Sequence, residues 1–310
     1  MKTRLFWLVL LLFITGCAAE LVLEKDGALA VIPRQDRTSR HLLVDATVNG
    51  EGPFRLALDS GASISVLIES VADAAEVEEI KDKRVLLRGM TGWGYFPVAT
   101  AERVTVGDLD WSPPMLAVLP DSLPLADRID GLLGTDFLGQ YAVAYFADDR
   151  AVRLYPKDML ADRGFRGWTS TPLYEMHLSQ SDATVLVFNM IIAGQRIPAI
   201  LDIGAEVSLM NRRAARAVGA RTRRSKTGGV TGATGPTIVA TRVLFHEVWV
   251  GNHVWHRRNF LVADFPVFEA LSLHKRPAAI AGIDLFRDRD FIIDFAGGRL
   301  LVRTARQRGK

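Results

Sequence analysis

The chain has 310 residues, 49% of them hydrophobic and 24% charged, and its formal net charge is +3. This composition excludes wholesale disorder, and the length allows one large core or two domains of ordinary size. The basic residues are scattered except at residues 221–226 and in the last ten positions. Neither run has interleaved aromatic residues or a known nucleic-acid motif, so we do not expect nucleic-acid binding.

The first seventeen residues predict an export signal. Lys2 and Arg4 precede an apolar run, residues 5–14, that is too short to span a membrane as a helix. The following Ile14-Thr15-Gly16-Cys17 resembles the lipobox of bacterial lipoproteins. This resemblance implies lipidation of Cys17 and a chain anchored to a bacterial membrane, facing the periplasm in a Gram-negative cell. The alternative is an ordinary cleaved signal with a cysteine nearby.

Cys17 is the only cysteine in the sequence, so no intramolecular disulfide can form although export would permit one. Anchoring explains a cysteine at this position alone, and several acyl chains hold a protein more durably than one. We therefore expect a lipoprotein signal at residues 1–17 and a tether at residues 18–38.

Landmarks of the first half recur in the second half, displaced by about 140 to 150 residues. Three pairs of segments match in order: Leu58-Asp59-Ser60-Gly61-Ala62 with Leu201-Asp202-Ile203-Gly204-Ala205, Gly89-Met90-Thr91-Gly92 with Gly229-Val230-Thr231-Gly232, and Leu132-Leu133-Gly134 with Ile280-Ala281-Gly282. Two copies are too few for a solenoid. The sequence therefore predicts two duplicated lobes, at residues 39–158 and 173–305, joined by a linker at residues 159–172.

Short strands dominate the pattern of each lobe. Alternating apolar residues predict one hairpin per lobe, with turns at Asn49-Gly50-Glu51-Gly52 and at Ala193-Gly194-Gln195, and each returning strand ends at an Asp. One short helix is expected in each lobe, at residues 69–77 and 211–218. The predicted fold class is therefore all-β and bilobal.

Asp59 and Asp202 are the candidate functional residues. Asp followed by small residues often marks only a turn, because Asp and Ser bond to nearby backbone and Gly permits positive φ. Here the Asp ends a buried apolar strand and recurs once per lobe. If the two carboxyl groups meet, they share one proton, and the pair can activate a water while polarising a carbonyl group.

Asp59-Ser60-Gly61-Ala62, the Gly-rich stretch after it and Leu132-Leu133-Gly134 resemble the retropepsin and pepsin class of aspartic peptidases. The resemblance covers both halves of the chain. It implies a pepsin-like fold of two retropepsin-like lobes, and a monomer that hydrolyses peptide or protein substrates with no cofactor.

Residue roles follow from this resemblance. It implies that Asp59 and Asp202 are catalytic, that Ser60 braces the two Asp loops, and that residues 89–96 and 228–235 are flaps. The residues implied to support the Asp turns are Gly61, Ala62, Gly204, Ala205, Gly134 and Gly282, and those implied to act in the flaps are Gly92, Trp93, Tyr95 and Gly232.

The second lobe departs from the pattern of this class. Ile203 stands where the class has Thr or Ser, and Glu206 replaces the small residue found at Ser63. A missing hydroxyl bond costs on the order of 1 to 3 kcal/mol locally. Two functions therefore stay open: an active endopeptidase, or an impaired module that binds extended peptides or envelope partners.

Other possible sites are weaker. His253 and His256 are too close for the helical zinc-protease pair and lack an acidic third ligand, so no metal is expected. Residues 227–235 are Gly-rich but lack the ending of a phosphate loop, and no Gly-x-Ser-x-Gly elbow is present. We expect Asp130, Asp136 and Asp284 to cap turns beside the supporting segments.

Overall fold

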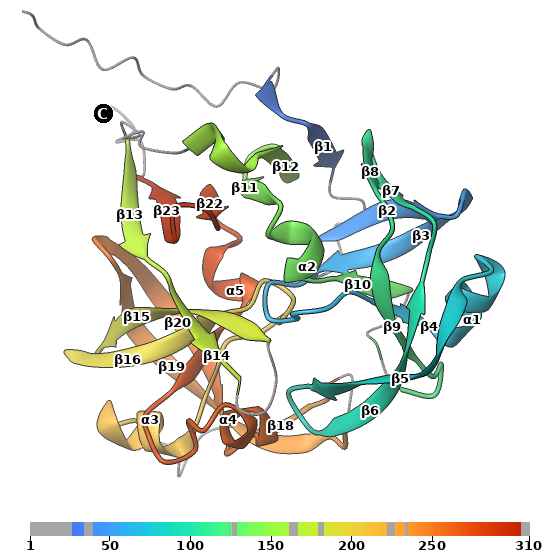
Figure 1. Ribbon diagram of the computed structural model, residues 1–310. Helices are drawn as coiled ribbons and strands as arrows, with labels where there is room; N and C mark the ends of the chain where they lie inside the picture. The colour runs from blue at the N-terminus through green and yellow to red at the C-terminus, as the bar shows by residue number, and fades with distance from the viewer. Residues whose placement is uncertain are drawn as a thin grey trace, which may run out of the picture.

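The computed structural model describes residues 27–33, 40–123, 125, 129–160, 167–178, 183–221, 227–232 and 235–304. Their strands form three sheets, one in each half of the chain and a third that both halves build (Figure 1). The all-β fold with two lobes that the duplication predicts is therefore confirmed.

The N-terminal lobe is built on a nine-stranded sheet. In spatial order its strands are β5 (Glu78–Arg88), β6 (Trp93–Thr100), β9 (Met115–Leu119), β4 (Val66–Ile68), β10 (Gly131–Leu133), β3 (Glu51–Leu58), β2 (Leu43–Val48), β7 (Val104–Val106) and β8 (Leu109–Trp111). Strand β10 pairs in parallel with β3 and antiparallel with β4. The end of β3, which carries Asp59, is thus held from the side by the segment before Gly134.

The C-terminal lobe repeats this plan in an eight-stranded sheet. Its strands, in spatial order, are β14 (Tyr174–His177), β15 (Thr184–Ile192), β16 (Gln195–Leu201), β21 (Ala279–Ala281), β17 (Leu209–Met210), β20 (His253–Val262), β19 (Ile238–Val250) and β18 (Thr227–Val230). Strand β21 pairs in parallel with β16 and antiparallel with β17, as β10 does with β3 and β4.

Both predicted hairpins are present, as β2–β3 and β15–β16. Their turns have positive φ at both central residues, 51° and 89° at Asn49 and Gly50 and 48° and 75° at Ala193 and Gly194. Such turns match the right-handed twist of the strands that they join. Each hairpin returns the chain to the middle of its lobe, where the Asp follows.

The two predicted helices are α1 (Glu69–Ala74) and α3 (Arg212–Ala217). The Asn211 side chain caps α3 by accepting the Ala214 N–H at 2.8 Å, and Gly219, with φ of 66°, follows its end. The lobes also contain α2 (Thr135–Leu138), α4 (Pro266–Ala270) and α5 (Ile283–Phe286), so one helix per lobe was an undercount. Helices of four or five residues are too short to show a helical hydrophobic period.

A six-stranded central sheet joins the halves. Its order is β1 (Ala30–Pro33), β12 (Ala151–Pro156), β11 (Tyr141–Phe146), β22 (Phe291–Asp294), β23 (Arg299–Arg303) and β13 (Trp168–Pro172). In its middle, Ala142 pairs with Asp294 and Tyr145 with Phe291. Tyr145 and Asp294 are equivalent in the duplication, and so are Ala142 and Phe291. A local two-fold axis between β11 and β22 therefore maps one of these pairs onto the other. The span 159–172, expected as a linker, supplies β13.

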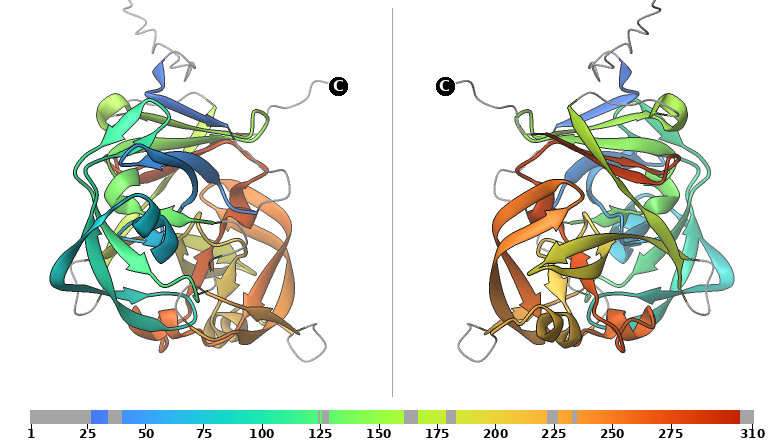
Figure 2. Two further views of the ribbon diagram at one scale, coloured as in Figure 1. Left: turned by 90° about the vertical axis from the view of Figure 1, so that its right-hand side faces the viewer. Right: turned by 90° about the vertical axis from the view of Figure 1, so that its left-hand side faces the viewer.

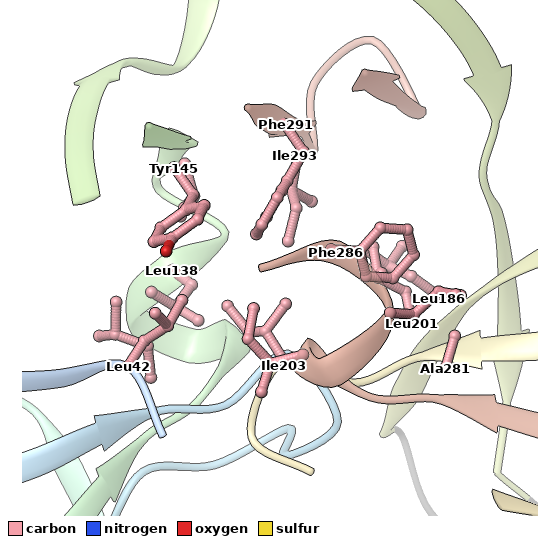
Figure 3. Packing of buried hydrophobic residues seen from close by; sticks show 14 of the residues in the cluster. Leu42, Leu138, Tyr145, Leu186, Leu201, Ile203, Ala281, Phe286, Phe291 and Ile293 are labelled. Atoms are coloured by element: carbon pink, nitrogen blue, oxygen red, sulfur yellow. The ribbon is translucent and has the colours of Figure 1, made fainter. Parts of the chain in front are cut away.

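The lobes also share one hydrophobic core. Leu42, Leu138 and Tyr145 of the first half meet Ile203, Leu201, Phe286 and Phe291 of the second (Figure 3). Ile203 is fully buried there. Figure 2 shows the central sheet at one end of the molecule and the β5–β6 hairpin at the other.

The predicted signal and most of the tether, including Cys17, lie outside the described residues. Within the described part of the chain, no helix is both long and apolar enough to cross a membrane.

Candidate active site

The two Asp loops have nearly the same backbone geometry. The Asp59 N–H donates to Leu133 O at 2.9 Å, and the Asp202 N–H donates to Ala281 O at 3.1 Å. The Asp59 Oδ1 accepts the N–H groups of Gly61 and Ala62 at 2.7 and 3.0 Å. The Asp202 Oδ1 accepts the Ala205 N–H at 2.8 Å. Each carboxyl group is thus held by the turn that follows it.

The loops also bring the carboxyl groups together across the lobe boundary. A methyl group added at Gly204 would lie 2.3 Å from the Asp59 Cγ, and one added at Gly61 would lie 2.7 Å from the Asp202 Cγ. Each carboxyl group therefore lies directly against the glycine of the opposite loop, where no side chain fits. Each carboxyl group also shifts the pKa of the other.

The surroundings of the two carboxyl groups differ. Burial raises the pKa of Asp202 well above its usual range, and the charge of Asp59 raises it further. Burial also raises the pKa of Asp59. In both loops two backbone N–H groups oppose the rise by stabilising the ionised form, those of Gly61 and Ala62 at Asp59 and those of Gly204 and Ala205 at Asp202. The pKa of Asp202 is thus raised further than that of Asp59, which favours Asp202 as the carboxyl group that keeps a shared proton.

Ser60 braces the two loops as the resemblance implied. Its Oγ donates to Leu201 O at 2.9 Å and accepts the Ile203 N–H at 3.1 Å, and the side chain is fully buried. Ile203 has no hydroxyl to return this bond, and its side chain joins the shared core instead (Figure 3). The brace is one-sided.

The predicted supporting glycines lie directly beneath the Asp loops. A Cβ at Gly134 or Gly282 would come within 2.8 Å of Ala62 O or 2.7 Å of Ala205 O, respectively. The segments before these glycines, β10 and β21, hold the Asp-bearing strands by parallel pairing. Four of the six residues implied as supports, Gly134 with Ala62 and Gly282 with Ala205, therefore meet at two points of close backbone contact.

Ser65 and Ser208 also support the loops, although the sequence did not suggest this role. The Ser65 Oγ donates to Asp136 Oδ1 at 2.7 Å and accepts the Gly134 N–H at 2.9 Å. The Ser208 Oγ donates to Asp284 Oδ1 at 2.7 Å and accepts the Gly282 N–H at 3.1 Å. The signal was available, because a Ser recurs six residues after each Asp.

The aspartates beside the supporting segments have structural partners, as expected of turn-capping residues. Asp136 and Asp284 accept the serine hydroxyls, and Asp130 Oδ2 accepts the Arg55 N–H at 2.7 Å. Their side chains stabilise the framework that positions the Asp pair.

Both Asp residues border a cavity of about 1110 Å³ between the lobes. Polar and apolar surface contribute about equally to its walls, which come from both lobes, and the apolar residues include Leu43, Leu87, Ile129, Val207, Val230 and Leu261. The charged residues that border it, besides the Asp pair, are Arg40, His41, Arg55, Arg88, Glu206 and Arg242. A chain of several residues can occupy this space with apolar side chains on both sides of the carboxyl groups.

Two hairpins meet above the cavity. The Gly232 N–H donates to Thr91 Oγ1 at 3.2 Å, and a Cβ at Gly235 would lie 2.4 Å from Thr91 O and 2.8 Å from Gly92 N. Thr91, only 2% exposed, is thus enclosed by the tip of the opposite hairpin. Gly92 and Gly232 permit this contact between the predicted flaps.

Trp93 and Tyr95, which the resemblance implied to act in the flap, do not cover the cavity. They are 67% and 59% exposed and do not border it, whereas Leu87 and Met90 do. Side chains alternate between the two faces of a strand, and Phe96 packs inward in a hydrophobic cluster of the N-terminal lobe. Trp93 and Tyr95 therefore lie on the outer face of the flap.

The described residues contain no group of three or more His, Cys, Asp or Glu side chains placed to hold a metal ion. His253 is buried against Trp255, with its Nε2 contacting Thr169 Oγ1 and, at 3.1 Å, Val302 O. His253 thus contributes to packing between the C-terminal lobe and the central sheet.

A two-lobed β fold in which each lobe brings one carboxyl group to a shared cavity defines the aspartic protease class of architecture. The family described as Aspartyl protease matches residues 44–137 and 188–285, more than half of the sequence, so the chain belongs to this family. One matched segment lies within each of the two duplicated units.

The fold also resembles solved structures. One is the crystal structure of aspartic proteinase from Irpex lacteus, with a TM-score of 0.55 and 15% sequence identity over 89% of this chain and 97% of that one. At this identity the likeness shows the fold. No curated protein matches the chain.

Replacing Ser60 by Ala tests the one-sided brace. Ser60→Ala leaves the buried Leu201 carbonyl and Ile203 N–H without their partner, so we expect the free energy of unfolding to fall by about 1–3 kcal/mol. Chemical denaturation measures this, with Ser63→Ala, which no described hydrogen bond involves, as the matched control. Equal losses in the two variants would contradict the brace.

Replacing Gly204 by Ala tests the contact between the Asp loops. The added methyl group overlaps the Asp59 carboxyl group, so we expect a loss of about 1–3 kcal/mol in the free energy of unfolding. Gly228→Ala is the control, because a Cβ at Gly228 has no neighbour within 4 Å and its φ is not positive. Stability unchanged in both variants would mean that the loops are not in contact.

Proposed function

We propose that the chain is an aspartic endopeptidase in which Asp59 and Asp202 are the catalytic pair. One observation carries the proposal: each carboxyl group packs against the glycine of the opposite loop, at the floor of a cavity that both lobes build. Family membership supports the same reaction class. Both Asp residues come from one chain, so we also propose that the monomer is sufficient.

The reaction needs only proton transfers between the pair, water and substrate. A water held between the carboxyl groups attacks the peptide carbonyl carbon and gives a proton to ionised Asp59, while the proton of Asp202 passes to the carbonyl oxygen. The tetrahedral intermediate then breaks its C–N bond, Asp59 returns the proton to the leaving nitrogen, and Asp202 recovers its own. The difference between the two pKa values suits these roles.

The substrate that fits this site is an extended peptide segment. Hairpins β5–β6 and β18–β19 offer backbone groups above it, and the apolar residues of the walls accept side chains on both sides of the cleaved bond. The hairpins touch each other, so a segment must enter by parting them or from an open end of the cavity.

Substituting each Asp by Asn tests the catalytic pair. In residues 18–310, Asp59→Asn and Asp202→Asn should each lower kcat/KM about 10²–10⁴-fold in an acid-range assay on a peptide library, because neither amide can transfer the proton. Asp110→Asn, an exposed position, is the control and should stay active. Activity that survives Asp202→Asn would contradict a two-lobe mechanism.

The alternative is a module that binds extended peptides without cleaving them. The buried Ile203, in place of a second bracing hydroxyl, is the observation that favours it. Saturable peptide binding without any cleavage by the parent chain, unchanged in Asp59→Asn, would support this function over the endopeptidase.

We also propose that the protein is exported and anchored through a lipid on Cys17, which would leave the lobes on a tether at a bacterial membrane surface, facing the periplasm in a Gram-negative cell. Cys17→Ser should abolish incorporation of a labelled fatty acid and move the protein from the membrane to the soluble fraction. An ordinary cleaved signal predicts no label in the parent chain and no change in Cys17→Ser.

A further inference from the structure

The two lobes differ in the residue that precedes the Asp-bearing hairpin. Leu43 pairs with Ala57 in the first lobe, and Val187 pairs with Ile200 in the second. Because Ala57 and Ile200 are equivalent in the duplication, His41 of the first lobe corresponds to Val185 of the second. The first lobe thus has an ionisable side chain at a position where the second lobe has an apolar one.

His41 lies in a cluster of charged groups that borders the same cavity as Asp59. Its Nδ1 is 3.5 Å from Glu206 Oε1, and Arg40 Nη1 is 3.7 Å from Glu206 Oε2. Glu206 belongs to the loop of Asp202, so these contacts cross the lobe boundary. Arg287 donates to Arg40 O at 2.5 Å, and the His41 side chain is only 13% exposed.

Asp202 has an apolar counterpart to this cluster. A small recess on its side of the cavity is bordered by Val185, Ile200, Val267 and Leu271, with Arg88 of the β5–β6 hairpin as its one charged neighbour besides Asp202 among the described residues. Asp59, Asp202 and His41 all border the main cavity, and the charge of His41 lowers the pKa of Asp59. The imidazole of His41 is therefore placed to stabilise negative charge on Asp59, whereas the equivalent position in the second lobe, Val185, is apolar.

We propose that His41, held by Glu206 of the opposite lobe, is a positioning residue that keeps the negative charge of the pair on Asp59 and the proton on Asp202. This inference rests on the proposed function. In this role, His41 determines which carboxyl group receives the proton of water, and Glu206 holds the imidazole in position across the lobe boundary.

The sign of the effect depends on when His41 is charged. Burial and the charge of Arg287 lower the pKa of His41, while Glu206 and Asp59 oppose this by favouring the imidazolium. The imidazole is therefore charged in acid and neutral above its lowered pKa. The stabilisation of ionised Asp59 is present in the acid range, where two carboxyl groups can share a proton, and is lost as the pH rises.

The direct test is a carboxyl ¹³C NMR titration of the soluble chain, residues 18–310, with Asp59 and Asp202 assigned through Asp59→Asn and Asp202→Asn. In the parent chain, Asp59 should ionise first. In His41→Gln its midpoint should rise by about one pH unit, because a nearby positive charge is removed. In His41→Arg the midpoint should stay low, because the charge is retained.

Arg242→Gln is the matched control, since Arg242 borders the same cavity on an exposed part of β19. It should leave the Asp59 midpoint unchanged. A midpoint that is unchanged in folded His41→Gln, or that moves equally in His41→Arg, would overturn the inference.

A second measurement is made without substituting His41, so it remains possible if the His41 variants do not fold. The imidazole resonances of His41 in the parent chain should show an inflection at the Asp59 midpoint, and Asp59→Asn should remove it, because coupled groups report each other's titration. Absence of that inflection would also overturn the inference.

These titrations need no activity, so the two proposals can fail separately. If the chain cleaves no peptide but the Asp59 midpoint moves in His41→Gln, the proposed function fails and the positioning role stands. If peptides are cleaved, the acid limb of kcat/KM should move with the Asp59 midpoint in His41→Gln and stay in place in His41→Arg. If the acid limb of kcat/KM is the same in His41→Gln as in the parent chain, the positioning role alone is wrong.

Discussion

The close approach of two carboxyl groups across a local two-fold axis is the constraint on which the rest of the structure depends. Each carboxyl group occupies the space where the opposite loop would carry a Cβ, so both loops require glycine at that position. The serine, aspartate and glycine networks beneath the loops, and the parallel strands beside them, hold the backbone in place. The central sheet repeats the same symmetry in the pairing of β11 with β22.

A magnitude argument explains how the second loop manages without a hydroxyl. A hydrogen bond contributes about 0.5–1.5 kcal/mol net, whereas burying an Ile side chain contributes about 1.5–3 kcal/mol. Ile203 is fully buried among residues of both lobes, so the apolar contact offsets the loss of the second brace. The departure that the sequence presents as a defect therefore becomes part of the packing between the lobes.

Local sequence patterns could predict the elements that repeat. The duplication located Asp202 although Ile203 breaks the motif, and the two hairpins followed from alternation and turn residues. The one-turn helices α2 and α5 were missed because four residues carry no period. The outward direction of Trp93 and Tyr95 depends on the register of β6, and a shift of one residue reverses both faces of a strand. No local pattern links His41 to Glu206, because only the packing of the lobes brings them together.

Duplication within one chain permits an asymmetry that two identical subunits cannot have. In a symmetric pair of lobes, neither carboxyl group would be favoured to hold the proton. Here the residues that differ between the lobes favour negative charge on Asp59 and the proton on Asp202. The charge of His41 lowers the pKa of Asp59, while the equivalent residue on the side of Asp202 is the apolar Val185. A residue that carries charge in acid is thus retained next to the carboxyl group that must be ionised, and an apolar one next to the carboxyl group that must keep its proton. The divergence of the second lobe is therefore compatible with the reaction that we propose, because that reaction needs two unequal carboxyl groups.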